Sequence, residues 1–177
     1  MIYRAKGSEA EEEPSEQRRN IATNAYHLLS TWSIVPGARM DAEFEPDAFT
    51  AWLKGVEEIV KASGHYDVAM IQLGNVLVNA PEGSDGLWIH PVIAKAMNDR
   101  ERTSLRDGYS TGIRNSRGVY TVDPEGKPEL ELAAKYRQRA NEIEDTGCQR
   151  LATTLRDVAD SYDRDAERII SHDGVPH

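Results

Sequence analysis

Residues 128–171 read PELELAAKYRQRANEIEDTGCQRLATTLRDVADSYDRDAERIIS, and in this stretch one glycine separates two long runs with helical spacing. Apolar side chains recur every three or four residues over 132–143 and again over 151–169. Such spacing places them along one face of a helix that packs against a core. Because Gly147 leaves only a short connection, the two helices are predicted to form an antiparallel hairpin.

The same spacing recurs towards the N-terminus, between breaks marked by proline and glycine. Pro36-Gly37 ends the first predicted helix, and Pro46 suits the first turn of the second. No run shows the sustained alternation of a strand, and the one candidate strand, at 119–122, has no obvious partner. The predicted helices cover about 15–35, 46–62, 67–78, 90–98, 99–109, 128–145 and 148–171.

We therefore predict an all-α fold, a compact bundle of six to seven helices whose last two form the antiparallel hairpin. A single helical domain is expected over 17–177, and the loop at 121–128 is the candidate for a boundary inside it. The residues expected in the core lie on the apolar faces of these helices: Ile21, Leu28, Leu29, Trp32, Phe49, Trp52, Leu53, Val56, Leu151, Leu155, Val158 and Tyr162.

The composition restricts the class of protein and of partner. The 177 residues are 39% hydrophobic and 29% charged, as in a soluble globular chain. The net charge of −9 disfavours general binding to nucleic acid or to an anionic membrane, since both are polyanions. Cys148 is the only cysteine, and neither a signal peptide nor a membrane-length apolar stretch is present. The chain is therefore expected in the cytoplasm.

Residues 1–16 are predicted to form a short stub and an acidic linker. The stretch 7–16 combines five glutamates with Gly, Ser and Pro and offers nothing to bury. Two interpretations of the start stay open. Either Met1 is an introduced start on a chain cut from a longer protein, or the N-terminus is native and frayed.

Residues 106–120 read RDGYSTGIRNSRGVY, which neither core packing nor a solvated helix face explains well. Glycines permit unusual backbone angles, and arginines offer forked donors to carboxylates or phosphates. Over 100–120, five arginines stand against two carboxylates, a local net charge of +3. A candidate anion site is predicted at Arg106, Arg114, Asn115, Ser116, Arg117 and Gly118, with Tyr109, Tyr120 and Trp88 as stacking candidates.

A structural role is the favoured alternative for these residues. An acidic chain supplies many carboxylates, so the arginines are expected to pair with them and tie the segment to the helical body. Trp88 is expected to pin its loop to the core. Asp157 and Asp160 share a helix face and could hold a magnesium ion, but ion pairs of Asp160 with Arg156 and Arg164 on the same helix are favoured.

No sequence motif for catalysis was found. The chain has no His-Glu-x-x-His metal motif, no P-loop and no nucleophile elbow. Cys148 stands at a helix start, where a thiolate would be favoured, but nothing in the sequence supplies a base for it. We therefore assign no catalytic residue, no metal site and no cofactor.

Three stretches carry a resemblance to a known family: AYHLLSTWSIVPG at 25–37, NSRGV at 115–119 and VADSY at 158–162. They resemble the C-terminal region of a family of very long, uncharacterised bacterial proteins. The similarity covers nearly the whole chain, from Tyr3 to about Arg168. It implies a piece of a larger bacterial protein, and it brings no activity and no functional residue.

Two functional hypotheses follow. The leading one is a non-enzymatic helical interaction or scaffolding domain, whose partner is another domain of a parent protein or a separate protein. The alternative is a module that binds an anion, a nucleotide or a nucleic-acid backbone through the Arg/Gly-rich segment at 100–120. Nucleic acid is disfavoured by the net charge, no membrane partner is expected, and the oligomeric state is left open.

Overall fold

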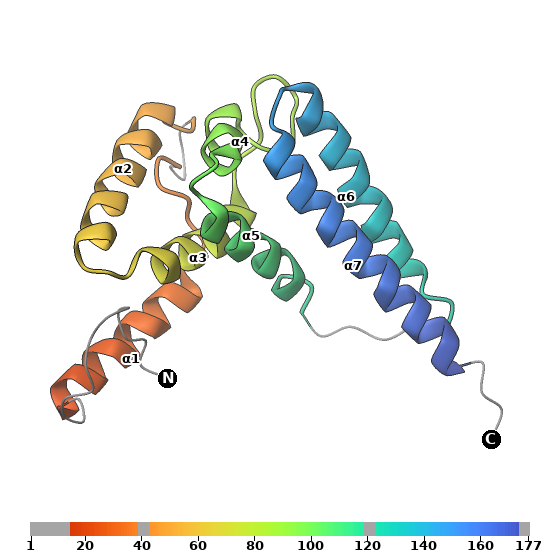
Figure 1. Ribbon diagram of the computed structural model, residues 1–177, viewed down its shortest axis with the longest axis horizontal. Helices are drawn as coiled ribbons and strands as arrows, with labels where there is room; N and C mark the ends of the chain where they lie inside the picture. The colour runs from red at the N-terminus through yellow and green to blue at the C-terminus, as the bar shows by residue number, and fades with distance from the viewer. Residues whose placement is uncertain (1–14, 39–42, 119–122, 174–177) are drawn as a thin grey trace.

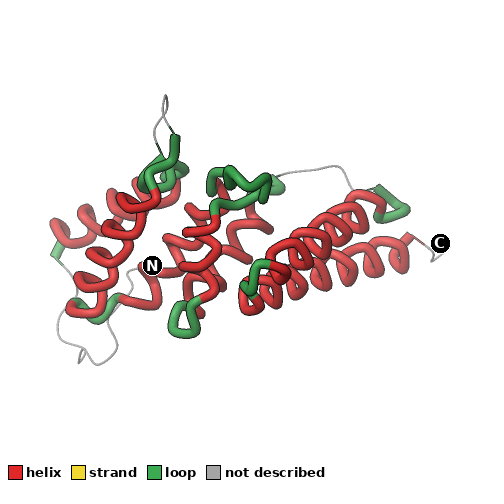
Figure 2. The backbone as a smooth tube through the Cα atoms, turned by 90° about the horizontal axis from the view of Figure 1, so that it is seen from above, coloured by secondary structure: helices red, strands yellow, loops and turns green. Residues whose placement is uncertain are grey.

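The structure is a computed structural model that describes residues 15–38, 43–118 and 123–173. Within these ranges the regular structure is entirely helical, which confirms the predicted all-α fold (Figure 1; Figure 2). The predicted linker up to residue 14, the candidate strand at 119–122 and Tyr120 lie outside the described residues. The elements are α1 (Glu16–Thr31), α2 (Pro46–Ala62), α3 (Tyr66–Val76), the 3₁₀ turn η1 (Leu77–Asn79), α4 (Pro91–Asn98), α5 (Thr103–Asn115), α6 (Lys127–Asp145) and α7 (Gln149–Asp173).

Helices α6 and α7 form the predicted antiparallel hairpin, which stands at one side of the molecule (Figure 1). Gly147 adopts a φ of +87°, a left-handed conformation that suits glycine and turns the chain between the helices. Ala140 and Ile143 of α6 are fully buried, as are Leu151 and Leu155 of α7. The apolar faces read from the sequence are therefore the faces that meet.

The ion pairs of the hairpin differ from the predicted ones. Asp160 was expected to pair with Arg156 and Arg164 within α7, but it pairs with Arg137 of α6, which also contacts Asp163. Arg156 reaches across to Glu144, with Nη1–Oε1 2.9 Å apart. The predicted pairs were wrong because spacing along one helix cannot show which charges a neighbouring helix presents.

Helices α3 and α5 cross so closely that their backbones touch. A Cβ on Gly108 would lie 2.0 Å from the carbonyl oxygen of Ile71, and one on Gly74 would lie 2.2 Å from that of Leu105. Glycine is the one residue that permits such an approach. The glycines of the Arg/Gly segment were expected to serve unusual backbone angles, yet Gly108 and Gly112 lie within α5 and form its contact face.

The hairpin packs against α4 and α5 and shares a hydrophobic core with the other helices. Asn98, the last residue of α4, accepts a hydrogen bond from the backbone N–H of Arg150 at 2.8 Å and donates to the carbonyl oxygen of Gly147 at 3.4 Å. Its side-chain oxygen thereby caps the first turn of α7. Buried apolar side chains form a continuous cluster from Val35 to Tyr162, with members on both sides of the predicted boundary at 121–128.

Most residues predicted for the core lie in it. Leu28 is the exception, since its side chain is 71% exposed on α1, which projects from the remaining helices (Figure 1). The spacing identified an apolar stripe on this helix but could not show how little of it the neighbours cover. The side chains of Ile21 and Leu29 lie outside the described ones. Phe49, Leu53, Leu151, Leu155, Val158 and Tyr162 are buried, and Trp32, Trp52 and Val56 are half-buried.

Three tyrosines pack around the junction of the hairpin with α5. Tyr136 and Tyr162 stack with their ring centroids 5.8 Å apart, and Tyr109 of α5 is 3% exposed. Burial raises the pKa of all three phenols. In the unfolded chain a tyrosine ionises near pH ~10. Above that pH the unfolded state therefore binds fewer protons than the folded state, so the stability held by these groups is lost as the pH rises.

We expect this tyrosine-linked stability to be complete below about pH 9 and to decline above about pH 10. Urea unfolding followed by circular dichroism at a series of pH values measures the decline. The Tyr109→Phe variant keeps the ring and removes the ionisable group, so its free energy of unfolding should fall less over the same interval. An equal fall in the variant and the wild type would contradict a contribution from Tyr109.

Candidate binding sites

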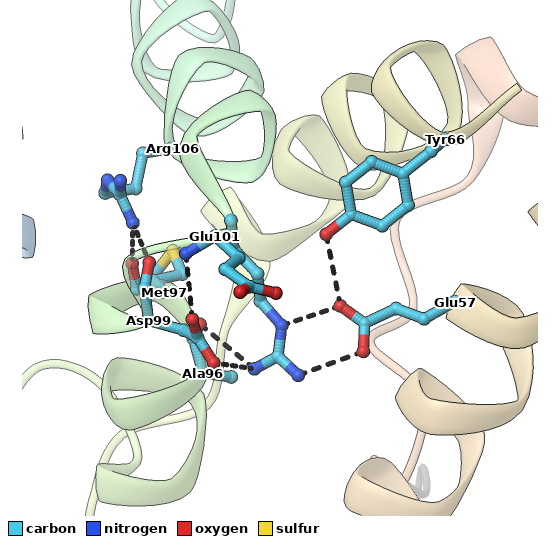
Figure 3. Close-up of polar contacts among 8 residues, drawn as sticks. Glu57, Tyr66, Ala96, Met97, Asp99, Glu101 and Arg106 are labelled. Atoms are coloured by element: carbon cyan, nitrogen blue, oxygen red, sulfur yellow. Dashed lines mark hydrogen bonds and ion pairs between the residues drawn. The ribbon is translucent and has the colours of Figure 1, made fainter. Parts of the chain in front are cut away.

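The predicted anion-binding residues do not converge on one open surface, and Arg106 illustrates why. Its guanidinium points into the protein, where Nη1 donates to the carbonyl oxygens of Met97 and Asp99 at 2.7 and 2.5 Å (Figure 3). Nη2 donates to the hydroxyl of Thr103 at 3.1 Å. Burial and the nearby charge of Arg150 lower the pKa of Arg106. Arg106 therefore satisfies carbonyls at the C-terminal end of α4.

Arg102 joins the start of α5 to α2 through a bidentate ion pair. Its Nε and Nη2 lie 2.7 and 3.0 Å from the two carboxylate oxygens of Glu57. The Tyr66 hydroxyl donates to the same carboxylate at 3.4 Å, and the Arg102 Nη1 donates to the carbonyl oxygen of Ala96 at 3.2 Å (Figure 3). The hydrogen bonds that Arg102 donates to the Glu57 carboxylate raise the pKa of Arg102. Two of the segment's arginines therefore serve internal contacts.

At the C-terminal end of the Arg/Gly segment, some side chains contact α6 and others are exposed to solvent. Arg117 donates to Glu129 of α6, with Nη2–Oε1 2.6 Å apart, and the Glu129 side chain is fully buried. Arg114 and Gly118 are exposed. Ser116 donates its hydroxyl to the carbonyl oxygen of Ile113. Of the three arginines in the predicted anion site, Arg106 points into the protein, Arg117 is paired with Glu129, and Arg114 is exposed.

The stacking candidates are placed differently from one another. Tyr109 is buried under the hairpin, so its ring offers no open face. Trp88 is half-buried and packs against the core, and the guanidinium carbon of Arg139 lies 4.7 Å from the centre of its ring. A cation over a tryptophan ring is attracted by the negative face of the π system. Trp88 therefore links its loop to α6, in the structural role favoured from the sequence.

A groove of about 390 Å³ lies between α2 and α4, and no sequence motif indicated it. Its apolar wall includes Phe49 and Leu53 of α2 and Val92 of α4. Lys54 and Lys95 are exposed at its rim. The two helices are about forty residues apart in sequence, so only the fold brings these side chains together. The full lining is Phe49, Thr50, Leu53, Lys54, Glu57, Val92, Lys95, Ala96 and Arg102.

A second hollow, the polar cleft, has a volume of about 560 Å³ and lies where α1, α3 and α5 end. Its lining contains amides, hydroxyls and one tryptophan, and none of the lining residues carries a charge. Two residues from the predicted anion site, Asn115 and Ser116, belong to it, whereas no arginine does. The lining is Thr31, Trp32, Ser33, Ile71, Gln72, Asn75, Asn79, Thr111, Gly112, Asn115 and Ser116.

Neither a membrane-spanning helix nor a metal-binding cluster occurs in the described part of the chain. None of the helices in the described ranges is both long enough and apolar enough to cross a bilayer. The described residues also contain no group of three or more His, Cys, Asp or Glu side chains that could hold a metal ion. The chain matches no family model, no curated protein and no solved structure. The resemblance to long bacterial proteins therefore stays a prediction.

Proposed function

We propose that this chain is a non-enzymatic interaction domain that binds an acidic, apolar segment of a protein partner in the groove between α2 and α4. One observation carries the proposal. The groove combines an apolar wall, formed by the half-buried Val92 over the buried Phe49 and Leu53, with two exposed lysines at its rim. An apolar anchor in a pocket surrounded by complementary charge is the usual centre of a protein interface.

The charges at the groove define the partner. Lys54 and Lys95 take part in none of the ion pairs or hydrogen bonds of the described residues, whereas Arg102 and Glu57 neutralise each other. The rim is therefore positive on a chain of net charge −9. A segment with a large apolar side chain between aspartates or glutamates complements this pattern, and charge complementarity also speeds encounter. Burial of one such side chain contributes roughly 1.5–3 kcal/mol.

The groove is built on helices whose relative position is held by side-chain contacts. The Glu57–Arg102 ion pair spans the gap from α2 to α5, and Arg102 also donates to the last turn of α4. Arg106 binds the C-terminal end of the same helix. A site held in this way loses little conformational entropy when a partner binds, which favours affinity.

The expected parent protein and compartment are the same as those predicted from the sequence. The partner is another domain of a larger bacterial protein or a separate protein, and the compartment is the cytoplasm. The lone cysteine and the resemblance at 25–37 support this setting. Arg102, Arg106 and Arg117 already bind groups of the protein itself, which leaves the anion-binding alternative with Arg100 and Arg114 as the exposed arginines among the described residues of 100–120.

The groove proposal predicts a charge-dependent peptide ligand. Selection from a random peptide library on the wild-type chain should enrich peptides with a large apolar residue flanked by Asp or Glu. Reversal of both rim charges, Lys54→Glu with Lys95→Glu, should weaken an enriched peptide by about tenfold or more, because attraction becomes repulsion. Fluorescence anisotropy of the labelled peptide measures the dissociation constant.

A matched variant separates the groove from the net charge. Lys127→Glu with Lys135→Glu makes the same change in charge on α6, and both lysines are exposed. This control should bind the peptide nearly as the wild type does. The proposal fails if no such peptide is enriched, if both double variants weaken binding equally, or if the chain itself turns over a small substrate.

A further inference from the structure

Three helices end at the polar cleft, which is separate from the α2/α4 groove. Helix α1 ends at Thr31, η1 continues α3 to Asn79, and α5 ends at Asn115. All three residues line the cleft. Helices α3 and α5 run in the same direction, since Ile71 faces Gly108 and Asn75 faces Gly112 one turn further along both helices.

A helix C-terminus is the negative end of the helix dipole. Its last carbonyl groups lack partners inside the helix, and cations are favoured beside it by about 0.3–1 kcal/mol for each helix end. The effect falls off within the last turn, which is the part of α5 from Thr111 to Asn115 that lines the cleft. Three such ends at one hollow therefore favour a positively charged occupant.

The side chains of the cleft add oxygen acceptors, and several of them already donate hydrogen bonds to their own helices. The hydroxyls of Thr31 and Thr111 donate to backbone carbonyls four residues earlier. The Asn75 amide donates to the carbonyl of Ile71 in the same way, and the Asn79 amide donates to that of Val76. The two hydroxyls therefore offer a ligand only oxygen lone pairs, whereas each amide keeps one N–H beside its oxygen.

The Asn75 Oδ1 has no hydrogen-bond partner, but it is buried beside Gly112 where α3 meets α5, so it is not counted among the acceptors that the cleft offers to a ligand. Trp32 adds an aromatic ring to the same lining, and such a ring attracts a cation to its face. Arg114 lies on the last turn of α5 but is not among the lining residues.

We propose that the polar cleft binds a protonated alkylamine. An ammonium group donates three hydrogen bonds and accepts none, which matches a lining of neutral acceptors beside a tryptophan. A calcium or magnesium ion would call for carboxylate ligands, and the lining contains none. The same chemistry occurs in a free polyamine and in a lysine side chain of a protein partner, so both sources belong in the test.

Isothermal titration calorimetry with the full chain tests charge recognition directly. Cadaverine and spermidine represent the free amines, and a capped peptide with a single lysine represents the protein source. Pentanediol, the neutral analogue of cadaverine, and the same peptide with norleucine are the matched controls. At least one amine ligand should bind about tenfold more tightly than its neutral analogue, and the tighter of the two amine classes identifies the source. Equal binding of charged and neutral analogues would overturn the proposal.

A charge placed in the cleft locates the site. Asn115→Lys puts an ammonium group at an exposed lining position, so the chain should fold normally and bind the amine about tenfold or more weakly through repulsion. Thr153→Lys adds the same charge at an exposed position of α7, away from the lining, and should leave binding near the wild-type value. Unchanged binding in Asn115→Lys, or equal weakening in both variants, would refute the assignment.

Discussion

Replacement of Gly108 with alanine is expected to lower the free energy of unfolding by about 3 kcal/mol or more. The new Cβ would lie 2.0 Å from the carbonyl oxygen of Ile71 and 2.7 Å from its Cα, so the backbones of α3 and α5 would have to separate. Backbone atoms cannot rotate away as a flexible side chain can. The gain in helix propensity from glycine to alanine, about 1 kcal/mol, is too small to offset this clash. Urea unfolding of the variant measures the loss.

Gly55 provides the matched control because it also lies inside a helix, α2, and a Cβ there would meet nothing within 4 Å. Gly55→Ala should leave the protein equally stable or make it more stable by up to about 1 kcal/mol. A Gly108→Ala variant as stable as Gly55→Ala would show that α3 and α5 are not in backbone contact. The comparison separates the packing of the crossing from the general effect of removing a helical glycine.

The sequence was sufficient to predict the hairpin and most of the helices because both depend on local patterns, whereas the helix predicted at 99–109 runs from Thr103 to Asn115. The spacing at 132–143 and 151–169 reports one face of each helix, and Gly147 reports the turn between them. The burial of Ile143 and Leu151 at the contact agrees with this pattern. Such signals need no knowledge of the other helices.

The parts that could not be predicted depend on contacts between distant segments. The roles of Gly108 and Gly112 were predicted as unusual backbone angles, because a glycine for close packing and a glycine for a turn look the same in sequence. Leu28 read as core because a stripe does not show whether a neighbour covers it. Asp160 pairs with Arg137, which lies on another helix, and no rule of sequence spacing relates the two residues.

The candidate sites were the least accessible to sequence reasoning. The α2/α4 groove and the polar cleft are lined by residues from separate segments of the chain, so each site exists only when the fold brings those segments together. The arginines were conspicuous in sequence, but Arg102 and Arg106 bind groups of the protein itself. In an acidic chain, arginines pair with carboxylates and carbonyl groups of the chain itself. A cluster of arginines in such a sequence is therefore weak evidence for a ligand-binding site.

The second large effect is expected at Arg117. Glu129 is fully buried and accepts a hydrogen bond from Arg117, so Arg117→Ala would leave a buried carboxylate without that partner. We expect the free energy of unfolding to fall by about 2–4 kcal/mol, because removal of one member of a buried pair exposes the full cost of the other charge. Replacement of both residues, Arg117→Met with Glu129→Met, removes both charges, so its loss should be smaller than that of Arg117→Ala.

Arg114 is the control that separates the two roles considered for this segment. It lies three residues earlier, is exposed and takes part in none of the ion pairs found among the described residues, so Arg114→Ala should change stability by no more than about 0.5 kcal/mol. If the segment binds anions instead, both alanine variants should weaken salt-sensitive binding to a polyanion such as heparin, and neither should lower the melting temperature. A large loss of stability confined to Arg117→Ala, without heparin binding by the wild type, would establish that Arg117 fastens the end of α5 to α6.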